Sequence, residues 1–453
     1  MKVVKFGGSS LASGNQVKKV FDIVTSDPDR KVVVVSAPGK RYAEDRKVTD
    51  LLIELGERSL RGERAPEYLT AVIARYSQVA EELKLPAEIV SKIENDLIEL
   101  LDADKTRQDR YIDAIKASGE DSNAKLIAEY FKSRGIEASY INPKDAGLFV
   151  EETCGTAQVL KKSYENLKAL RELPGILIFP GFFGYNEEGE VVTFSRSGSD
   201  ITGSILANGT GADLYENFTD VDAVYSANPN VVPNPKEIRE LTYREMRELS
   251  YAGFSVFHDE ALIPAFEAGI PVHIKNTNNP EAAGTRIVNE RKNTNGPVIG
   301  IASDDDFCSI YVNRYLMNKE IGFGRKLLSI LEDFGLTYEH SPSGIDDLSI
   351  ILRQKQMNAE TEELILERIR TDLKPDEVTV EHNLSLIMMV GEGMRHNIGT
   401  AARASKALAE AGVNIEMINQ GSSEVSMMFG VKEAQEKKAV QALYEEFFVS
   451  VYA

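Results

Sequence analysis

Short apolar runs recur along the first 290 or so residues, and polar positions return after each run, a pattern that predicts strands separated by helices or loops. The runs are continuous rather than alternating, which is typical of strands buried on both faces of a parallel sheet. The expected strands are Val3–Phe6, Lys31–Ser36, Ala138–Ile141, Gly175–Phe179, Val191–Thr193, Asp213–Asn217 and Pro271–Ile274. The fold class predicted for this part of the chain is α/β.

Helical periodicity fills the intervals between these runs. The expected helices lie around Val17–Val24, within Thr49–Ile115 with breaks at Pro66 and Pro86, from about Ser118 to the residue before Gly135, and from about Ser199. The segment 49–115 is polar and rich in charge, so we expect a helical lobe beside the sheet.

Beyond a polar linker at residues 291–297, the sequence repeats itself with an offset of 77 residues. Gly322, Leu331, Gly335, Glu339, Gly344 and Ser349 recur as Gly399, Leu408, Gly412, Glu416, Gly421 and Ser426. A repeat of this length favours a duplicated small domain, and two α+β modules of the βαββαβ type fit it. We expect domains at 1–290, 298–380 and 381–453, with the alternative that the two modules interleave, since the strand Val298–Ala302 suits either.

The composition excludes several classes of protein. The 453 residues exceed what one hydrophobic core usually supports, and 42% apolar with 27% charged residues is an ordinary balance for a folded protein. The net charge of −19 repels phosphate backbones and acidic membrane surfaces, so neither nucleic acid nor membrane is expected as a partner. The absence of a long apolar run or a leader, together with two distant cysteines, favours a reducing cytoplasm.

The first candidate site follows the first strand, in the sequence KFGGSS from Lys5. A lysine ends the strand, glycines let the backbone approach a ligand, and a helix begins within a few residues, so that its N–H groups point toward that ligand. This design suits a phosphate, although it is neither a Walker A loop nor a GxGxxG motif. A plain turn is the alternative.

Later segments place polar residues at strand ends or helix starts. Arg196, in the sequence SRSGSD, offers a planar guanidinium for a carboxylate, or is simply solvated. The sequence TDVDAVY from Thr219 suits a nucleotide's base and ribose, but an ordinary surface turn explains it locally. Lys275 stands at a strand end, where it meets phosphates or is merely exposed.

Two further residue types were considered for chemistry. Glu120 is expected at a helix N-terminus, where acidic residues are favoured on electrostatic grounds alone. The five histidines have no metal-ligand spacing and accompany no serine or cysteine motif, so neither a histidine base nor a metal site is expected.

Taken in order, these segments resemble a known family. KFGGSS, VTD at Val48–Asp50, SGE at Ser118–Glu120, SRSGSD, TDVDAVY, IKNT from Ile274 and the C-terminal repeat look like an aspartate kinase (aspartokinase) of the monofunctional type, with two ACT modules. The resemblance covers essentially the whole chain. It implies an amino acid kinase fold, an open and mostly parallel sheet between helices, and ATP-dependent phosphorylation of L-aspartate to 4-phospho-L-aspartate, the entry to lysine, threonine and methionine synthesis.

The resemblance also implies site residues, of which Lys5, Asp200 and Arg196 would be catalytic. Those for ATP are Lys5, Gly7, Gly8, Ser9, Thr219, Asp220, Tyr225, Asn230 and Lys275; those for aspartate are Ser36, Thr49, Glu120, Arg196, Ser199 and Asp200. Lys5 would neutralise the transferring phosphoryl group, Arg196 would bind the α-carboxylate, Glu120 the ammonium group, and Asp200 would orient Lys5. Magnesium would arrive with ATP, held by phosphates and water. Asn230 departs from the family, since many relatives carry an arginine there.

Regulation is implied by the ACT modules. The matching effector residues are Met317, Glu320, Phe323, Gly324, Glu339, Ser343 and Asp346. Three of them are acidic, which favours lysine over threonine as the effector, unless they are only solvated carboxylates. The Gly-Phe-Gly sequence at 322–324 differs from the Gly-Phe-Leu of lysine-sensitive relatives. ACT pairing implies a homodimer, with a homotetramer as the larger option.

Two alternatives remain: another amino acid kinase, acting on glutamate or a nucleotide, and a catalytically inactive amino-acid sensor. The SRSGSD loop, the Glu120 segment and the duplicated module argue against the first. The set Lys5, Glu120, Arg196 and Asp200 argues against the second.

Overall fold

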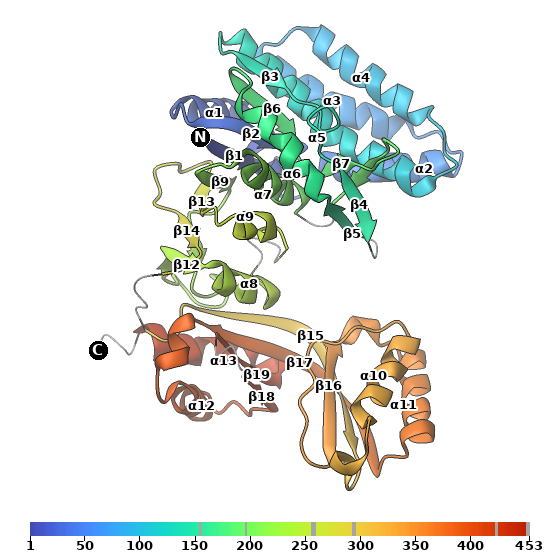
Figure 1. Ribbon diagram of the computed structural model, residues 1–453, viewed down its shortest axis with the longest axis vertical. Helices are drawn as coiled ribbons and strands as arrows, with labels where there is room; N and C mark the ends of the chain where they lie inside the picture. Colours follow the sequence, from blue (N-terminus) through green and yellow to red (C-terminus); the bar gives the residue numbers. More distant parts are fainter. Residues whose placement is uncertain (154–155, 195–196, 255–259, 292–295, 422–424, 450–453) are drawn as a thin grey trace. The chain divides into compact units, whose positions relative to one another are not determined.

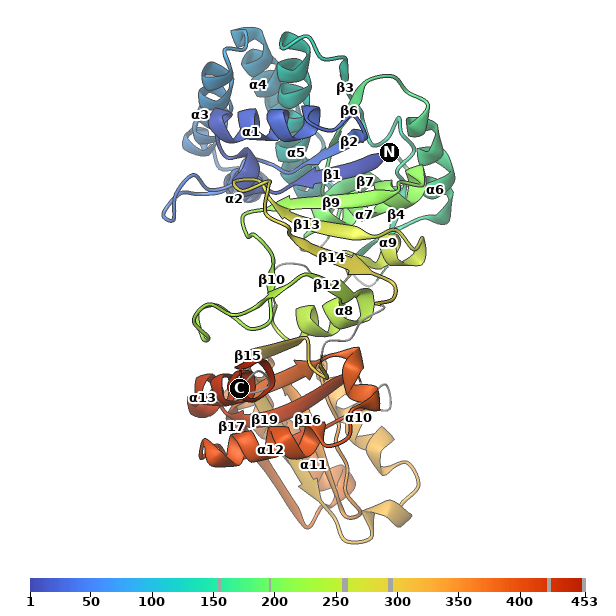
Figure 2. The same ribbon diagram turned by 90° about the vertical axis from the view of Figure 1, so that its left-hand side faces the viewer.

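The computed structural model describes residues 1–153, 156–194, 197–254, 260–291, 296–421 and 425–449 (Figures 1 and 2). The chain divides into two compact units. The first comprises Met1–Val224, Glu237–Arg247 and Ser255–Lys292, and the second comprises Tyr225–Lys236, Glu248–Phe254 and Asn293–Ala453. This division differs from the expected domain at 1–290, because two short segments before residue 290 group with the second unit.

An eight-stranded sheet forms the centre of the first unit, in the order β12-β14-β13-β9-β1-β2-β6-β3. Its strands are β1 (Lys2–Phe6), β2 (Arg30–Val35), β3 (Ala138–Tyr140), β6 (Ile176–Pro180), β9 (Leu214–Thr219), β12 (Glu240–Thr242), β13 (Val272–Asn276) and β14 (Thr285–Val288). The six strands from β13 to β3 are parallel, as predicted, whereas β14 and β12 run in the opposite direction at one edge.

Helices cover both faces of this sheet. The α-helices before the linker, within the described residues, are α1 (Gly14–Thr25), α2 (Val48–Leu60), α3 (Pro66–Leu83), α4 (Ala87–Leu101), α5 (Gln108–Ser133), α6 (Lys161–Leu167), α7 (Gly198–Thr210), α8 (Tyr243–Tyr251) and α9 (Ile263–Glu267). Val4, Phe6, Val33 and Val35 pack into one core with residues of α1 to α5. Because side chains alternate along a strand, Lys5 points to the other face, where it meets α7.

Short strands lie outside the main sheet. They are β4 (Val150–Thr153), β5 (Thr156–Val159), β7 (Phe183–Tyr185), β8 (Val191–Thr193), β10 (Val224–Tyr225) and β11 (Glu237–Ile238). The predicted strand at 191–193 is therefore present as β8, but it pairs with β7 in a hairpin and does not join the central sheet.

The helix predicted from Ser118 begins ten residues earlier, so that start was wrong. α5 runs through Ser118, Gly119 and Glu120 without a break, and these residues lie near its middle. Gly119 is accommodated by packing, because a Cβ there would lie 3.0 Å from both Ala37 Cβ and Leu52 Cδ1.

A five-stranded sheet, in the order β16-β15-β17-β19-β18, forms the second unit. Its elements are β15 (Gly300–Asn313), α10 (Phe323–Asp333), β16 (Asp347–Arg353), α11 (Ala359–Leu373), β17 (Glu377–Val390), α12 (Thr400–Glu410), β18 (Met417–Asn419), β19 (Ser426–Lys432) and α13 (Glu436–Tyr444). The predicted repeat has a structural counterpart. Gly322 and Gly399 both precede a helix with φ of +80° and +91°, and Gly335 and Gly412 follow those helices with φ of +68° and +65°.

The two long strands of this sheet contribute to two separate cores. Cys308, Ile310 and Val312 of β15 pack with residues of α10 and α11. Ile301, near the start of the same strand, packs instead with the core that contains residues of α12 and α13. The first residues of β15 therefore belong to the second core, whereas the later residues of the same strand belong to the first. Among the helices of the described residues, none has the length and apolar character required to cross a bilayer.

Candidate active site

A pocket of about 820 Å³ lies at the carboxyl ends of β1 and β2, beside the first turn of α7. Ligand sites of open parallel sheets occur at this edge. Ten of the residues predicted from the sequence line it: Lys5, Gly7, Gly8, Ser9, Ser36, Thr49, Glu120, Ser199, Asp200 and Asp220. Arg196, predicted as a catalytic residue, lies outside the residues that the structure describes.

Lys5 is held at the pocket by a buried polar network. Its ammonium nitrogen lies 2.6 Å from Asp200 Oδ1, and the two side chains are 9% and 12% exposed. Asn217 Nδ2 donates to the same carboxylate oxygen at 2.6 Å, and the Tyr215 hydroxyl donates to the Asp200 carbonyl at 3.2 Å. Sequence reasoning missed Asn217 and Tyr215. Their alternate positions on β9, with Asn217 in register with Lys5, are the signal that identifies them.

Two loops meet directly beside Lys5, where glycines are required. The Gly39 N–H donates to the Gly8 carbonyl at 2.9 Å, and a Cβ at Gly39 would lie 2.5 Å from the Gly8 carbonyl carbon. The short 3-10 helix η1 (Gly8–Leu11) begins at once after Gly7, as the sequence indicated. The backbone is therefore open on the pocket side, which suits an approaching phosphate.

Glu120 is a buried carboxyl group at the pocket wall, 5% exposed. Burial raises its pKa to about 8, an effect that a hydrogen bond from the Ala37 backbone partly offsets. Its Oε2 has no hydrogen-bond partner among the residues that the structure describes. The expectation that Glu120 stands at a helix N-terminus was wrong, since it lies mid-helix in α5, and the helix-start explanation for an acidic residue fails with it. A buried acceptor without a partner is costly unless a ligand satisfies it.

The start of α7 is shaped by strained and small residues. Phe182, which lines the pocket, has φ of +78°, and Ser197 at the helix start has φ of +57°. The Phe182 N–H donates to Thr202 Oγ1 at 3.0 Å, which holds the strained residue against α7. A Cβ at Gly181 would lie 2.6 Å from Ser199 Oγ, so Gly181 lets Ser199 approach the end of β6. Backbone strain of this kind is typical of functional sites.

The predicted nucleotide residues are only partly brought together. Asp220 lines the pocket and accepts a hydrogen bond from Thr219 Oγ1 at 3.3 Å. Thr219 ends β9, and Lys275 lies in β13 in register with Phe218, and neither is among the lining residues of the pocket. Tyr225 and Asn230 belong to the second compact unit. Within the described residues, no group of three or more His, Cys, Asp or Glu side chains could hold a metal ion.

The predicted effector carboxylates already have partners in the second unit. Glu320 lies 3.0 Å from Arg314 and 2.7 Å from Lys326, and the hydrogen bond from Lys326 holds its pKa below the usual value. Asp346 Oδ1 accepts from the Leu316 N–H at 2.9 Å. These carboxylates are therefore not simply solvated.

The other predicted effector residues lie in different surroundings. Met317 and Phe323 are buried in the core of the first module. Glu339 accepts a hydrogen bond from the Tyr251 hydroxyl and lies 3.6 Å from Arg353. Ser343, by contrast, lines a second pocket of about 770 Å³, together with Asp347, Glu381 and Glu416.

Comparisons with known proteins match this chain along its whole length. The family models for the amino acid kinase family and for the ACT domain match residues 1–276 and 387–447. Aspartokinase 3 of Bacillus subtilis (strain 168) is 71% identical over 451 residues, which cover 100% of this chain and 99% of that protein.

Two solved structures have the same fold over their full length. The aspartate kinase of Clostridium acetobutylicum, described as an allosteric enzyme, has a TM-score of 0.89 and 38% identity, and the match covers 99% of this chain and 100% of that one. Aspartokinase III of E. coli, in complex with aspartate and ADP, has a TM-score of 0.79 and 25% identity, with coverage of 99% and 100%.

Proposed function

The chain belongs to the aspartokinase family, and from that premise we propose how its pocket performs phosphoryl transfer from ATP to the side-chain carboxylate of L-aspartate. The observation that carries the proposal is the meeting of Lys5 with Glu120 in one pocket. The lysine supplies positive charge for phosphate, while the buried carboxyl group has a free acceptor for an ammonium. A substrate that carries an ammonium and an anionic oxygen satisfies both.

Glu120 recognises the amino group of aspartate. An ammonium beside Oε2 supplies the missing hydrogen bond and stabilises the ionised carboxylate, so binding lowers the raised pKa of Glu120. Ser36, Thr49 and Ser199, which line the same pocket, bind the remaining polar groups of the substrate. Arg196 completes the site at the α-carboxylate, where its planar guanidinium suits a two-oxygen acceptor.

Lys5 stabilises the charge of the transferring phosphoryl group. A carboxylate oxygen of aspartate forms a bond to the γ-phosphorus, the bond to the β,γ-bridging oxygen breaks, and ADP leaves with that electron pair. No proton moves, so no general base is required. Catalysis then rests on positioning and on cations, and positioning alone can supply about 7–11 kcal/mol. Asp200 and Asn217 fix the lysine in place.

The nucleotide is bound along the ends of β1 and β9. The N–H groups near Gly7, Gly8 and Ser9 bind phosphates, and Asp220, with Thr219 hydrogen-bonded to it, binds the nucleoside. Lys275 supplies a further phosphate contact in place of the arginine that Asn230 replaces. Mg²⁺ accompanies ATP and is held by phosphate oxygens and water. A cytoplasmic location is part of the proposal, since two distant cysteines suit a reducing compartment.

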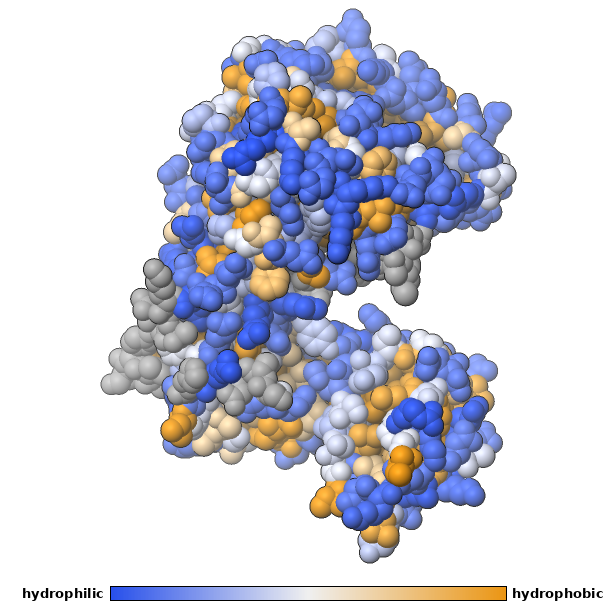
Figure 3. Space-filling view, in the orientation of Figure 1, coloured by the Kyte–Doolittle hydropathy of each residue, from blue (hydrophilic) through white to orange (hydrophobic). Residues whose placement is uncertain are grey.

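The second unit regulates the enzyme by binding an amino acid, and lysine is the effector that we propose, with threonine as the alternative. Three carboxylates line the second pocket beside Ser343, which supports a cationic ligand. A homodimer, or a homotetramer, is supported by exposed apolar residues in this unit. Ile321 and Ile398, at equivalent positions of the repeat, are almost fully exposed, and hydrophobic surface is visible in Figure 3.

A coupled ADP-release assay with a panel of amino acids tests the reaction. We expect turnover with L-aspartate and at least about a hundredfold less with L-glutamate, because the buried Glu120 fixes the ammonium while the pocket fixes the acceptor. Preference for glutamate or a nucleotide would identify a different amino acid kinase. A total lack of turnover alongside amino-acid binding would identify an inactive sensor.

A further inference from the structure

We propose that Lys47 is a further substrate-binding residue of this pocket, which contacts a carboxylate of aspartate, and that Arg75 is the positioning residue that holds its loop in place. The inference rests on the proposed function and extends it to the loop 39–47 between β2 and α2. Nothing in the motifs of the sequence singled out this loop.

A buried ion pair anchors the loop to the helical lobe. Arg75, on α3, is 4% exposed, and its Nη2 lies 2.7 Å from Asp45 Oδ2. The same nitrogen donates to the Arg46 carbonyl at 3.1 Å. Asp45 also accepts from the backbone N–H of Arg41 at 3.0 Å and from its guanidinium at 2.8 and 2.9 Å. Two arginines on one carboxylate hold the pKa of Asp45 far below its usual value, so the pair stays charged.

Arg75 reaches the glycine loop as well. Its Nη1 donates to the Gly39 carbonyl at 2.7 Å, and the Gly39 N–H donates to the Gly8 carbonyl at 2.9 Å. The Arg75 guanidinium therefore fixes the position of the loop that carries Lys47 and also that of Gly39, which packs against Gly8. A buried charge is costly unless it is well hydrogen-bonded. The hydrogen bonds of Arg75 to Gly39, Asp45 and Arg46 all hold this loop beside the pocket.

Four cations lie on the loop, and within the described residues Lys47 is the one that lines the pocket with a side chain left for a ligand. Arg46 does not line the pocket, and its guanidinium lies 5.4 Å from the centre of the Tyr68 ring. Arg41 is occupied by Asp45 and by Gln78 Oε1 at 2.5 Å, and Lys40 Nζ donates to the Ala43 carbonyl at 3.1 Å. Lys47 lines the pocket and is exposed, and its ammonium group has no hydrogen bond or ion pair to any residue within the described part of the chain. In a protein of net charge −19, a cation kept free beside the site concentrates anions there.

The position of Lys47 in the chain assigns it to aspartate rather than to ATP. It follows Ser36 and comes two residues before Thr49, and both of these belong to the proposed aspartate site. The residues proposed for the nucleotide phosphates come instead from the loop after β1. Aspartate brings two carboxylates into a strongly acidic protein. Arg196 is assigned to the α-carboxylate, so the side-chain carboxylate still requires a cation.

Steady-state kinetics of Lys47→Gln tests the contact, with Lys92→Gln as the matched control. Lys92 is an exposed lysine on α4 outside the pocket, and both variants change the net charge equally. We expect the KM for aspartate to rise about tenfold or more in Lys47→Gln, as for the loss of a hydrogen bond to a charged group. The KM for ATP should stay within about twofold, and Lys92→Gln should match the wild type.

Three outcomes would overturn the assignment. They are an unchanged KM for aspartate, an equal rise in the Lys92→Gln control, and a rise confined to ATP. The wild-type enzyme separates this failure from that of the proposed function. If the wild type releases no ADP with aspartate, the function itself is wrong; if it does and Lys47→Gln matches it, only the role of Lys47 is wrong.

A double-mutant cycle tests Arg75. Arg75→Met leaves Asp45 paired with Arg41, so we expect a folded protein whose KM for aspartate rises about as much as in Lys47→Gln. Because Arg75 acts through the loop, the double variant should be no worse than Lys47→Gln, and Arg75→Lys should recover part of the loss. Fully multiplicative effects on KM would contradict the coupling. If Arg75→Met does not fold, a second cycle with Asp45→Asn and Lys47→Gln tests the same ion pair from its other partner.

Discussion

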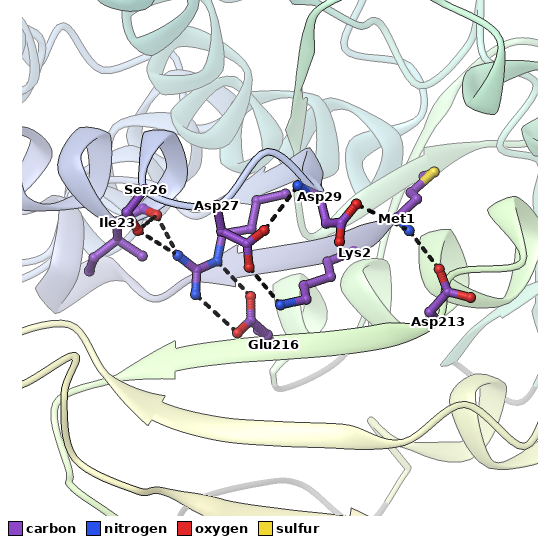
Figure 4. Close-up of polar contacts among 9 residues, drawn as sticks. Met1, Lys2, Ile23, Ser26, Asp27, Asp29, Asp213 and Glu216 are labelled. Atoms are coloured by element: carbon purple, nitrogen blue, oxygen red, sulfur yellow. Dashed lines mark hydrogen bonds and ion pairs between the residues drawn. The ribbon is translucent and has the colours of Figure 1, made fainter.

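Charged residues lie at both ends of strands β1 and β9, but the two ends differ in the partners that these charges have. At the amino ends, charges are paired with one another (Figure 4). Lys2 lies 2.6 Å from Asp27, the amino group of Met1 lies 2.5 Å from Asp213, and Arg30 Nε lies 2.7 Å from Glu216. At the carboxyl ends, Glu120 keeps an acceptor without a partner in the described part of the chain, and Lys5, although paired with Asp200, borders an open pocket.

The difference lies in what surrounds each charge. Arg30 makes two hydrogen bonds to Glu216, at 2.7 and 3.1 Å, and its guanidinium lies 5.5 Å from the centre of the Phe218 ring. Its remaining donors reach the Ile23 carbonyl and Ser26 (Figure 4). The amino-terminal charges are thus satisfied within the protein and stabilise the fold. At the carboxyl ends, Lys5 is paired with Asp200 but also faces the pocket, and Glu120 Oε2 is left for a substrate. One end of the sheet is therefore structural and the other is suited to catalysis.

Arg30→Met should have the largest effect, and it should fall on stability. Glu216 is 4% exposed in its side chain, so the variant leaves a buried charge without its partner, at a cost of about 3–5 kcal/mol. Denaturant unfolding measures the loss, while kcat per folded molecule should match the wild type. Arg30→Met with Glu216→Gln should recover much of the stability. An undiminished unfolding midpoint in the single variant would show that the amino-terminal pair is not structural.

Lys5→Met should have the opposite profile. Removing one electrostatic stabiliser of a transition state costs about 3 kcal/mol, so we expect kcat to fall at least about a hundredfold. Asp200 borders the pocket and keeps the hydrogen bond from Asn217, so the protein should stay folded and lose less stability than Arg30→Met. A variant with near wild-type turnover would contradict the role of Lys5.

Glu120→Gln should change how both binding and stability depend on pH. The folded-state pKa of Glu120 is raised to about 8 by burial, above its ordinary value of 4.5. Between these values the folded protein holds a proton that the unfolded chain has lost, so the wild type loses stability as pH rises from about 4.5 to 8. The variant should gain a few degrees in unfolding midpoint relative to the wild type between pH 5 and pH 8.

The same group makes substrate binding depend on pH. Aspartate's ammonium needs the ionised carboxylate, so the KM for aspartate should fall as pH rises toward 8 in the wild type. In Glu120→Gln the KM should be higher and nearly independent of pH over that range. A parallel pH profile for the two proteins would rule out Glu120 as the ammonium site.

Lys2→Met should have the smallest effect, and it is the control for Lys5 on the same strand. Lys2 and Asp27 are 25% and 24% exposed in their side chains, and such pairs contribute less than about 1 kcal/mol. The hydrogen bond from Lys2 lowers the pKa of Asp27, so this small stabilisation is present at neutral pH and lost in acid. Turnover should be unchanged. A large loss of activity would mean that charge on β1 matters wherever it lies.

The sequence was sufficient for the parts of the fold that depend on local pattern. Runs that are mainly apolar identified all six parallel strands of the first sheet, because a strand buried on both faces has few polar positions. It missed β12 and β14, which are short edge strands whose composition resembles that of loops. The start of α5 was misplaced because Gly119 resembles a helix boundary, and only packing against Ala37 and Leu52 explains its place within the helix.

In the candidate site, too, the residues within a local motif were predictable and those that act through distant contacts were not. Lys5, Gly7 and Gly8 follow one another in the chain, so their chemistry was visible in the sequence. Asn217 and Arg75 were not, because each acts through a contact across strands or between lobes that no local motif encodes. The raised pKa of Glu120 likewise depends on burial by residues from other elements.

The most direct test is a crystal structure of the protein with L-aspartate and a non-hydrolysable ATP analogue. The account predicts that the terminal phosphate lies within hydrogen-bonding distance of Lys5 Nζ, with the aspartate ammonium on Glu120 and a side-chain carboxylate oxygen in line with the terminal phosphorus. A terminal phosphate bound elsewhere, with Lys5 still paired only to Asp200, would contradict the assignment of the carboxyl ends of β1 and β9 as the catalytic end of the sheet.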